Sequence, residues 1–297
     1  MARLPALLHE RLEATARAYF EAPGLNIDFT APPRAPALVA HDSLTWRVMK
    51  NPVALTVGGI AAVILELAEP RVRTGVWEHT SFRRDPVTRM RRTGYAAMVT
   101  VYGPADAARA MIAGVARAHD RIEGVTPAGA PYRANDEELL NWVHATAAFG
   151  FVEAYRRYVR PLSGSELDQF YAEGAASAAL YGAHGAPTSA AEANALFSAM
   201  APKLERSDIL FEFFDIVRAA PLLPWRRLQR LIIRAAVEIT PDWARARLGL
   251  GSEFGFRPGY ESLVRTMGAT AERLVIESAA PAQACVRMGL PVDYLYR

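Results

Sequence analysis

Apolar residues recur every three or four positions along most of this chain, whereas the alternation typical of half-buried strands is scarce. Leu4, Leu8 and Leu12 share one face of an amphipathic N-terminal helix. The Asp85-Pro86 step indicates a helix start, because a carboxylate suits the N-cap and proline suits the first helical position. The pattern predicts further helices behind Asp42 or Ser43 and at residues 53–67, 85–102, 105–124, 135–159, 163–174 and 189–200. Residues 221–250 are expected to form an apolar helix and then a short one after Pro241-Asp242.

These segments predict one all-α, multi-helix domain, since no repeat, low-complexity tract or linker interrupts them. We expect an N-terminal helix and irregular Pro-rich arm at residues 1–39, a helical domain at residues 40–250, and a C-terminal helical extension at residues 251–297 packed on the same domain. The run 53–67 is apolar on all sides, so it is expected at the centre, either continuous or broken at Gly58-Gly59.

Composition limits the classes of function. Hydrophobic residues make up 51% of the chain and charged residues 22%, which favours a large buried core over disorder. The formal net charge is only +3 and the basic residues are spread out, so nucleic-acid binding is not expected. The single cysteine, Cys285, excludes an internal disulfide and is expected to be a buried thiol.

The longest apolar run, residues 52–65, is too short to cross a bilayer. The first twenty residues mix charged and apolar side chains and lack the core of a secretory signal. A cytoplasmic location is therefore expected, with peripheral membrane contact left open. The sequence does not specify an oligomeric state.

Two histidines fall on the apolar faces of expected helices. His119 lies four residues beyond Val115 and seven beyond Ile112, and His144 lies four beyond Leu140. Such an imidazole either is a core side chain hydrogen bonded to a backbone carbonyl or serves as a haem ligand, and spacing alone leaves both open. A closed zinc site is less favoured, because the sequence shows no third or fourth converging ligand.

Residues 75–93 are rich in arginine within an otherwise apolar chain. In a helix that starts at the Asp-Pro step, Arg89, Arg92 and Thr93 share a face, whereas Arg91 points elsewhere. Thr93 also lines up with apolar residues, so Arg89 and Arg92 are expected at the core boundary, able to reach a propionate or an acidic substrate. The alternative is a solvated face paired with nearby carboxylates.

Other catalytic signatures are missing from the sequence: there is no Gly-x-Ser-x-Gly, no P-loop and no dinucleotide fingerprint. Gly58-Gly59 precedes an apolar helical run but lacks a third glycine and a βαβ setting, so a phosphate-binding role is not favoured.

Three segments together resemble a known family. They are DSLTWRVMKNPVALTVGGIAAVILELAEPRVRTGVWEHTSFRRDPVTRMRRT, AHDRIEGVTPAGAPYRANDEELLNWVHAT and LPWRRLQRLIIRAAVEITPDWARARLGL. In this order they are similar to the bacterial oxygenase family that includes latex clearing protein and the fungal MpaB-type oxygenases. The resemblance covers about residues 40 to 250.

The resemblance implies an all-helical fold with a globin-like core and a b-type haem bound through a proximal histidine. His119 is the best match for this iron ligand, with His144 as a second family histidine near the haem or as the alternative ligand. On the distal side Arg89 and Thr93 match the family's Arg-x-x-Lys-Thr segment, while Arg92 stands where the family has lysine.

Glu78 or His79 is the expected source of an acid/base or distal group, again by resemblance. We therefore expect a haem-dependent oxygenase that acts on a hydrophobic small organic substrate with dioxygen. The lysine-to-arginine change at Arg92 argues against carrying over polyisoprene cleavage. The alternatives are a non-enzymatic ligand-binding helical protein and a haem enzyme that does not use dioxygen.

Overall fold

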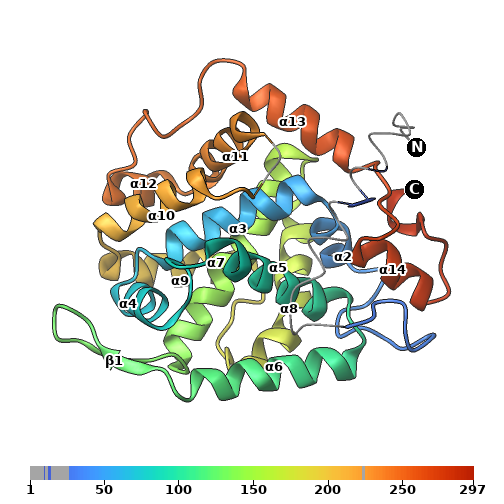
Figure 1. Cartoon of the computed structure of the whole chain (residues 1–297), viewed down its shortest axis with the longest axis horizontal. Coiled ribbons are helices and arrows are strands. Elements are labelled where there is room, and N and C mark those ends of the chain that lie inside the picture. Colours follow the sequence, from blue (N-terminus) through green and yellow to red (C-terminus); the bar gives the residue numbers. More distant parts are fainter. Residues whose placement is uncertain (1–9, 11–12, 15–26, 223–224) are drawn as a thin grey trace.

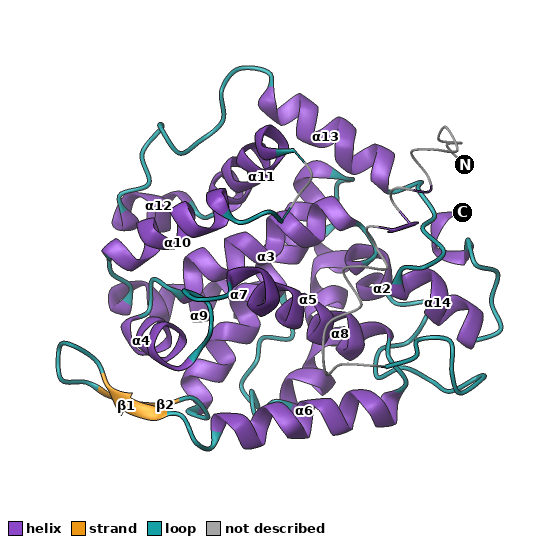
Figure 2. Ribbon diagram, in the orientation of Figure 1, coloured by secondary structure: helices purple, strands orange, loops and turns teal. Residues whose placement is uncertain are grey.

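The computed structural model describes residues 10, 13–14, 27–222 and 225–297. Within these residues the regular structure consists of α-helices, two short 3-10 turns and one two-stranded sheet, which confirms the all-α prediction (Figure 2). The helices are α2 (Leu44–Met49), α3 (Pro52–Glu66), α4 (Pro70–His79), α5 (Pro86–Tyr102), α6 (Ala105–His119), α7 (Glu137–Tyr158), α8 (Gly164–Leu180), α9 (Ala190–Met200), α10 (Asp208–Ala219), α11 (Arg226–Ile239), α12 (Asp242–Leu248), α13 (Tyr260–Ala271) and α14 (Ala280–Arg287).

Helices α3 and α7 form the centre of the molecule, and the other helices surround them (Figure 1). The continuous helix α3 shows that Gly58-Gly59 does not break the apolar run. Gly58 instead lies against the backbone of Gly150, where a Cβ on Gly58 would be 2.6 Å from the Gly150 carbonyl carbon. These two glycines therefore allow the two central helices to approach more closely than any side chain would permit.

The outer helices pack on this central pair. Helices α11 and α13 contact both α3 and α7, while α8 and α9 lie against α7. A third close approach brings α13 onto the end of α7, since a Cβ on Gly268 would lie 2.3 Å from the carbonyl oxygen of Tyr158. Helices α2 and α14 contact α5, which in turn packs against α6. The buried side chains form two hydrophobic clusters, a larger one around α3 and α7 and a smaller one around α5 and α14, and each contains residues from both halves of the chain.

Helix starts follow the predicted capping residues. The Asp85 carboxylate accepts a hydrogen bond from the Thr88 amide at 3.2 Å at the start of α5. Ser163 and Glu166 form a reciprocal capping box on α8, and Ser43 and Ser189 cap α2 and α9. Each side-chain oxygen satisfies an amide that has no partner inside the helix.

The segment after α6 differs from the prediction. The helix ends at His119 rather than near residue 124, and a hairpin follows, formed by β1 (Glu123–Val125) and β2 (Pro131–Arg133). Asn135 explains this end, because its side-chain amide donates to the Ala116 carbonyl at 3.3 Å. The hairpin projects from the body of the molecule (Figure 1). Within the hairpin, Tyr132 is buried in the hydrophobic core and Thr126 of the turn is buried too.

Helices α4 and α10 are additional to those expected from the sequence. Glu69 caps α4 by accepting from the amides of Arg71 and Val72, and Pro70 follows it. In α10 the run LFEFF mixes aromatic and apolar residues over a short span, where periodicity does not separate a helix from a strand. In the folded protein this run is helical and packs on α11.

A buried arginine holds the N-terminal arm to the body of the protein. The guanidinium of Arg287 donates to the carbonyls of Phe29 at 2.8 Å, Ala35 at 3.0 Å and Tyr102 at 2.7 Å. Through these bonds α14 ties the arm to the end of α5. The helix expected around Leu4–Leu12 lies outside the described residues apart from residue 10.

Within the described residues no single helix is long and apolar enough to cross a membrane. Helices α3 and α4 taken together have the required length and composition, but they are bent by 109° relative to each other. Cys285 is completely buried, as expected, and burial raises the pKa of its thiol to about 11.

Candidate active site

Two oppositely charged side chains on α3 and α5 influence each other electrostatically. Glu66 is the last residue of α3, Arg89 lies on the first turns of α5, and the two half-buried side chains attract each other electrostatically. Thr146, completely buried on α7, lowers the pKa of the Glu66 carboxyl, while its hydroxyl donates to the Val143 carbonyl at 2.9 Å. Three elements that are distant in sequence thus bring a carboxyl, a guanidinium and a hydroxyl together.

Burial dominates the electrostatics of this pair. Desolvation raises the pKa of Glu66 from 4.5 to about 7, and Arg89 and Thr146 only partly oppose that rise. Desolvation also lowers the pKa of Arg89, although the charge of Glu66 opposes it. A carboxyl whose pKa lies near neutrality can either hold or release a proton under ordinary conditions, as an acid/base group requires.

His119 lies near the same guanidinium. Burial and the positive charge of Arg89 lower its pKa, which favours the neutral ring. The ring is hydrogen bonded to the side chain of Asn135, whose amide nitrogen already donates to Asp120 at 2.6 Å. Because the Asn135 amide also donates to the Ala116 carbonyl at 3.3 Å, its oxygen is the group left to accept from the imidazole.

His144 stands on α7, one turn from Leu140, and is half-buried as the sequence predicts. Desolvation lowers its pKa to about 4, so the imidazole is neutral. Its Nε2 faces α8, where a Cβ on Gly174 would be only 3.3 Å away. None of the described residues forms a hydrogen bond with this ring, which distinguishes it from His119.

The arginine-bearing face of α5 is only partly at the core boundary. Arg89 is half-buried there, as predicted, but Arg92 is exposed and the prediction that it borders the core is wrong. Thr93 is exposed too, although it lies on the expected face, because the first turns of α5 run along the surface. The Arg89 guanidinium donates to the Thr93 hydroxyl, and that hydroxyl donates to the Arg89 carbonyl at 3.0 Å.

Glu78 and His79, the expected acid/base or distal candidates, are exposed at the end of α4. Their common partner is Tyr132 of the hairpin: its hydroxyl donates to Glu78 Oε2 at 3.5 Å and lies 3.1 Å from His79 Nε2. Neither side chain is joined to Arg89 or His119 by an interaction among the described residues. The two residues hold the hairpin against α4.

Glu66 is the residue that the sequence analysis missed. It marks the end of an apolar run, and an acidic residue that closes a buried helix is the one signal that points to it. Its pairing with Arg89 depends on how α5 folds back over α3, which periodicity does not report. Glu66 is therefore a further acid/base candidate beside Glu78 and His79.

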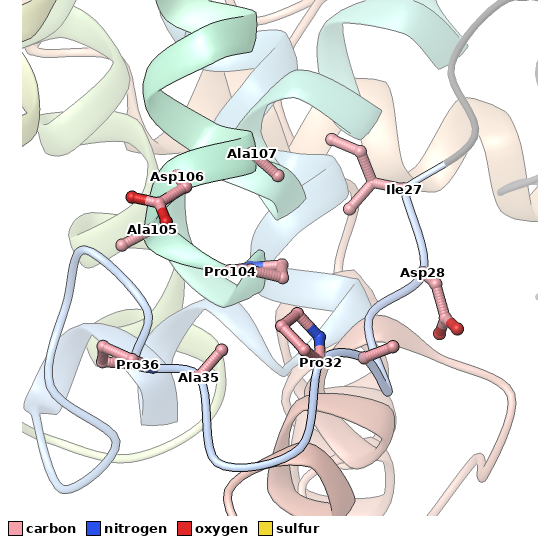
Figure 3. A pocket seen from close by; sticks show the side chains of 10 residues that line it. Ile27, Asp28, Pro32, Ala35, Pro36, Pro104, Ala105, Asp106 and Ala107 are labelled. Atoms are coloured by element: carbon pink, nitrogen blue, oxygen red, sulfur yellow. The ribbon is translucent and has the colours of Figure 1, made fainter.

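No three His, Cys, Asp or Glu side chains converge as a metal site in the described part of the chain. A shallow depression of about 520 Å³ lies between the arm and the start of α6 (Figure 3). Its walls are mostly alanine and proline with the carboxylates of Asp28 and Asp106, and none of the candidate residues lines it. It is a surface feature apart from the candidate site.

Comparison with known proteins gives one family. The chain matches the family model described as "ER-bound oxygenase mpaB/B'/Rubber oxygenase, catalytic domain" over residues 46–272. Searches of curated proteins and of solved structures each found no match. The matched range contains Glu66, Arg89, Thr93, His119 and His144, and it covers well over half of the chain. The chain therefore belongs to the MpaB and rubber oxygenase catalytic-domain family, and it is an enzyme of the oxygenase type.

Proposed function

We propose that this protein is a haem-dependent oxygenase acting on a hydrophobic small organic molecule with dioxygen. The observation that carries the proposal is the convergence of His119, Arg89 and Glu66, from three helices, within a domain of oxygenase type.

The residues fit a haem in three respects. Burial favours the neutral form of both candidate imidazoles, which is the form that binds iron. His119 has one nitrogen fixed by Asn135, the kind of outer hydrogen bond that orients a histidine ligand. Arg89 supplies a cation at the core boundary for a propionate or an oxygen-derived anion.

In this proposal His119 would hold the iron, with His144 as the alternative, and Arg89 with Thr93 would form the polar edge of the site. A bound haem b would supply iron for binding and activating dioxygen. Asn135 holds the His119 ring in one orientation and one tautomer. Glu66, with its pKa near 7, takes up or releases the proton at its carboxyl, and Arg89 stabilises the charged form.

The substrate class rests on the apolar surroundings of these polar groups. Partly buried apolar side chains, including Met90, Val143 and Phe149, pack at the edge of the core near the central helices. An apolar surrounding excludes water and favours an apolar substrate. The lysine of the related distal segment is replaced here by Arg92, an exposed residue, so polyisoprene is not proposed as the substrate.

The test is the absorption spectrum of the protein purified from haem-supplied cells, together with pyridine haemochrome and metal analysis. We expect a Soret band that His119→Ala abolishes or shifts, with His144→Ala as the matched comparison. A band lost only in His144→Ala would move the ligand to α7. A metal-free protein that carries an organic ligand in native mass spectrometry would contradict the proposal and support a binding protein.

A haem-containing protein that consumes no oxygen with any apolar substrate would leave the haem assignment intact and contradict the oxygenase assignment. Oxygen uptake is therefore measured separately from the spectrum. Asn135→Ala adds a second readout, because loss of the hydrogen bond to His119 is expected to shift the Soret band without removing it.

A further inference from the structure

The first turn of α11 carries a compact exposed cluster. Trp225, the N-cap residue, is 61% exposed, and Arg226, Arg227 and Arg230 are exposed beside it. We refer to these four residues as the Trp225 cluster. The opposite face of the helix is buried, so the cluster is the outer side of an element that the core holds firmly.

The charges of the cluster are not neutralised within the described parts of the chain. No described carboxylate forms an ion pair with Arg226, Arg227 or Arg230. Two acidic residues on the adjoining helix α10 are already engaged, because Glu212 pairs with Arg83 at 3.1 Å and Asp215 pairs with Arg218 at 3.1 Å.

This arrangement is unfavourable for the helix itself. The N-terminal end of a helix carries partial positive charge, and here the first turn contains arginines and no acidic residue. Arg226 and Arg230 are four residues apart and Arg227 and Arg230 three apart, so like charges repel along one face. In helix α6, by contrast, Arg117 lies in the last turn, where the partial negative charge of the helix end favours a cation.

An exposed indole beside unpaired arginines is suited to an anionic surface that also has an apolar layer. Tryptophan prefers the headgroup region of a bilayer, where its ring is apolar and its N–H remains wet. Arginines attract anionic lipids and bind their phosphates through two hydrogen bonds. A lipid surface offers both an apolar layer for the indole and anionic phosphates for the arginines, whereas a soluble acidic protein offers only the negative charge.

We propose that the Trp225 cluster binds this protein to the anionic face of a lipid bilayer. Trp225 enters the headgroup region, and the three arginines contact lipid phosphates. A nucleic acid is the less suitable polyanion, because the arginines are confined to little more than one helical turn and a single aromatic ring accompanies them. Binding at this surface brings the enzyme to substrates dissolved in the membrane, and it does not depend on haem.

The experiment is co-sedimentation of the full chain with vesicles of phosphatidylcholine, with and without phosphatidylserine. We expect binding that requires phosphatidylserine and weakens as salt is added. Replacing arginine with glutamine at 226, 227 and 230 should lower the partition coefficient about fivefold for each charge removed. Trp225→Ala should weaken binding at every salt concentration.

The matched control is Arg109→Gln, Arg117→Gln and Arg121→Gln, which removes the same charge from exposed positions on and after α6. This control should keep its binding to phosphatidylserine vesicles. Quenching of tryptophan fluorescence by brominated lipid, lost in Trp225→Phe, provides a readout that does not depend on charge.

The proposal is overturned if vesicle binding does not depend on phosphatidylserine, or if the control variant loses binding as much as the α11 variant does. It is also overturned if a DNA oligonucleotide competes fully with vesicles at equal salt. Thermal melting of each variant, with an unchanged midpoint, establishes that a loss of binding reflects the surface and not the fold.

Discussion

Gly58 of α3 and Gly150 of α7 face each other so closely that a Cβ on Gly150 would lie 2.3 Å from the Gly58 carbonyl oxygen. The contact is between two backbones, and backbone cannot move aside as a flexible side chain can. The close packing of α3 on α7 therefore requires glycine at both positions.

Gly150→Ala and Gly58→Ala are each expected to destabilise the protein by at least about 1–3 kcal/mol, because the added methyl group forces the central helices apart. Gly59→Ala is the matched control, since its Cβ would meet only a ring carbon of Phe151 at 3.9 Å. We expect that variant to match or exceed wild-type stability. Urea unfolding measures all three, and equal losses at residues 58 and 59 would refute the explanation.

Glu66 is expected to make stability depend on pH. Its folded-state pKa of about 7 lies above the unfolded value of 4.5, so its contribution is fully present below pH 4.5 and is lost as pH rises through 7. Glu66→Gln should remove about 2 kcal/mol of this pH dependence. The measurement is the free energy of unfolding of both proteins from pH 4.5 to 8. A difference between the two that stays constant over this range would contradict the assignment.

Arg89 and Arg92 are three residues apart and are expected to respond differently to substitution. Arg89→Gln removes the charge that faces Glu66 and the donor to Thr93, so it should cost about 2–3 kcal/mol and raise the pKa of Glu66 further. Arg92→Gln should change stability by less than about 0.5 kcal/mol, because its side chain is exposed. Carboxyl NMR titration and urea unfolding test both effects. Equal effects of the two substitutions would contradict the placement of Arg89 at the core boundary.

Arg287 is 1% exposed and satisfies three backbone carbonyls of the arm and of α5. Arg287→Met leaves these oxygens without a donor and should cost about 3 kcal/mol. Arg287→Lys is expected to recover only part of this loss, since one ammonium cannot match the planar fork. Limited proteolysis between residues 27 and 38 provides the specific readout. Unchanged resistance to cleavage in Arg287→Met would show that the arm is held by other contacts.

Much of the fold follows from local signals in the sequence. The boundaries of α5 are predicted by Asp85-Pro86 at its start and Gly103-Pro104 at its end, because an N-cap carboxylate and a proline act through neighbouring atoms only. The end of α6 is not predicted in the same way. It depends on Asn135, sixteen residues further on, whose side chain reaches back to the last turn.

The candidate site, too, was predicted only in part from the sequence. Periodicity places His119 and His144 on the inner faces of their helices, and motif order indicates the oxygenase family, which the family match confirms. Neither reveals that Glu66 faces Arg89, because residues on different helices leave no spacing in the sequence. The assignment of Glu78 and His79 rested on the resemblance to the family. In the structure they turn to Tyr132 instead.

The sequence by itself determined most of the helical segments, the apolar faces of those helices and the family to which the chain belongs. These properties arise from local capping and from side-chain order along one helix. The tertiary structure alone decided which charged groups meet, how close α3 and α7 lie and which carboxyl has its pKa near 7. These properties depend on the packing of distant segments and on the exclusion of water between them.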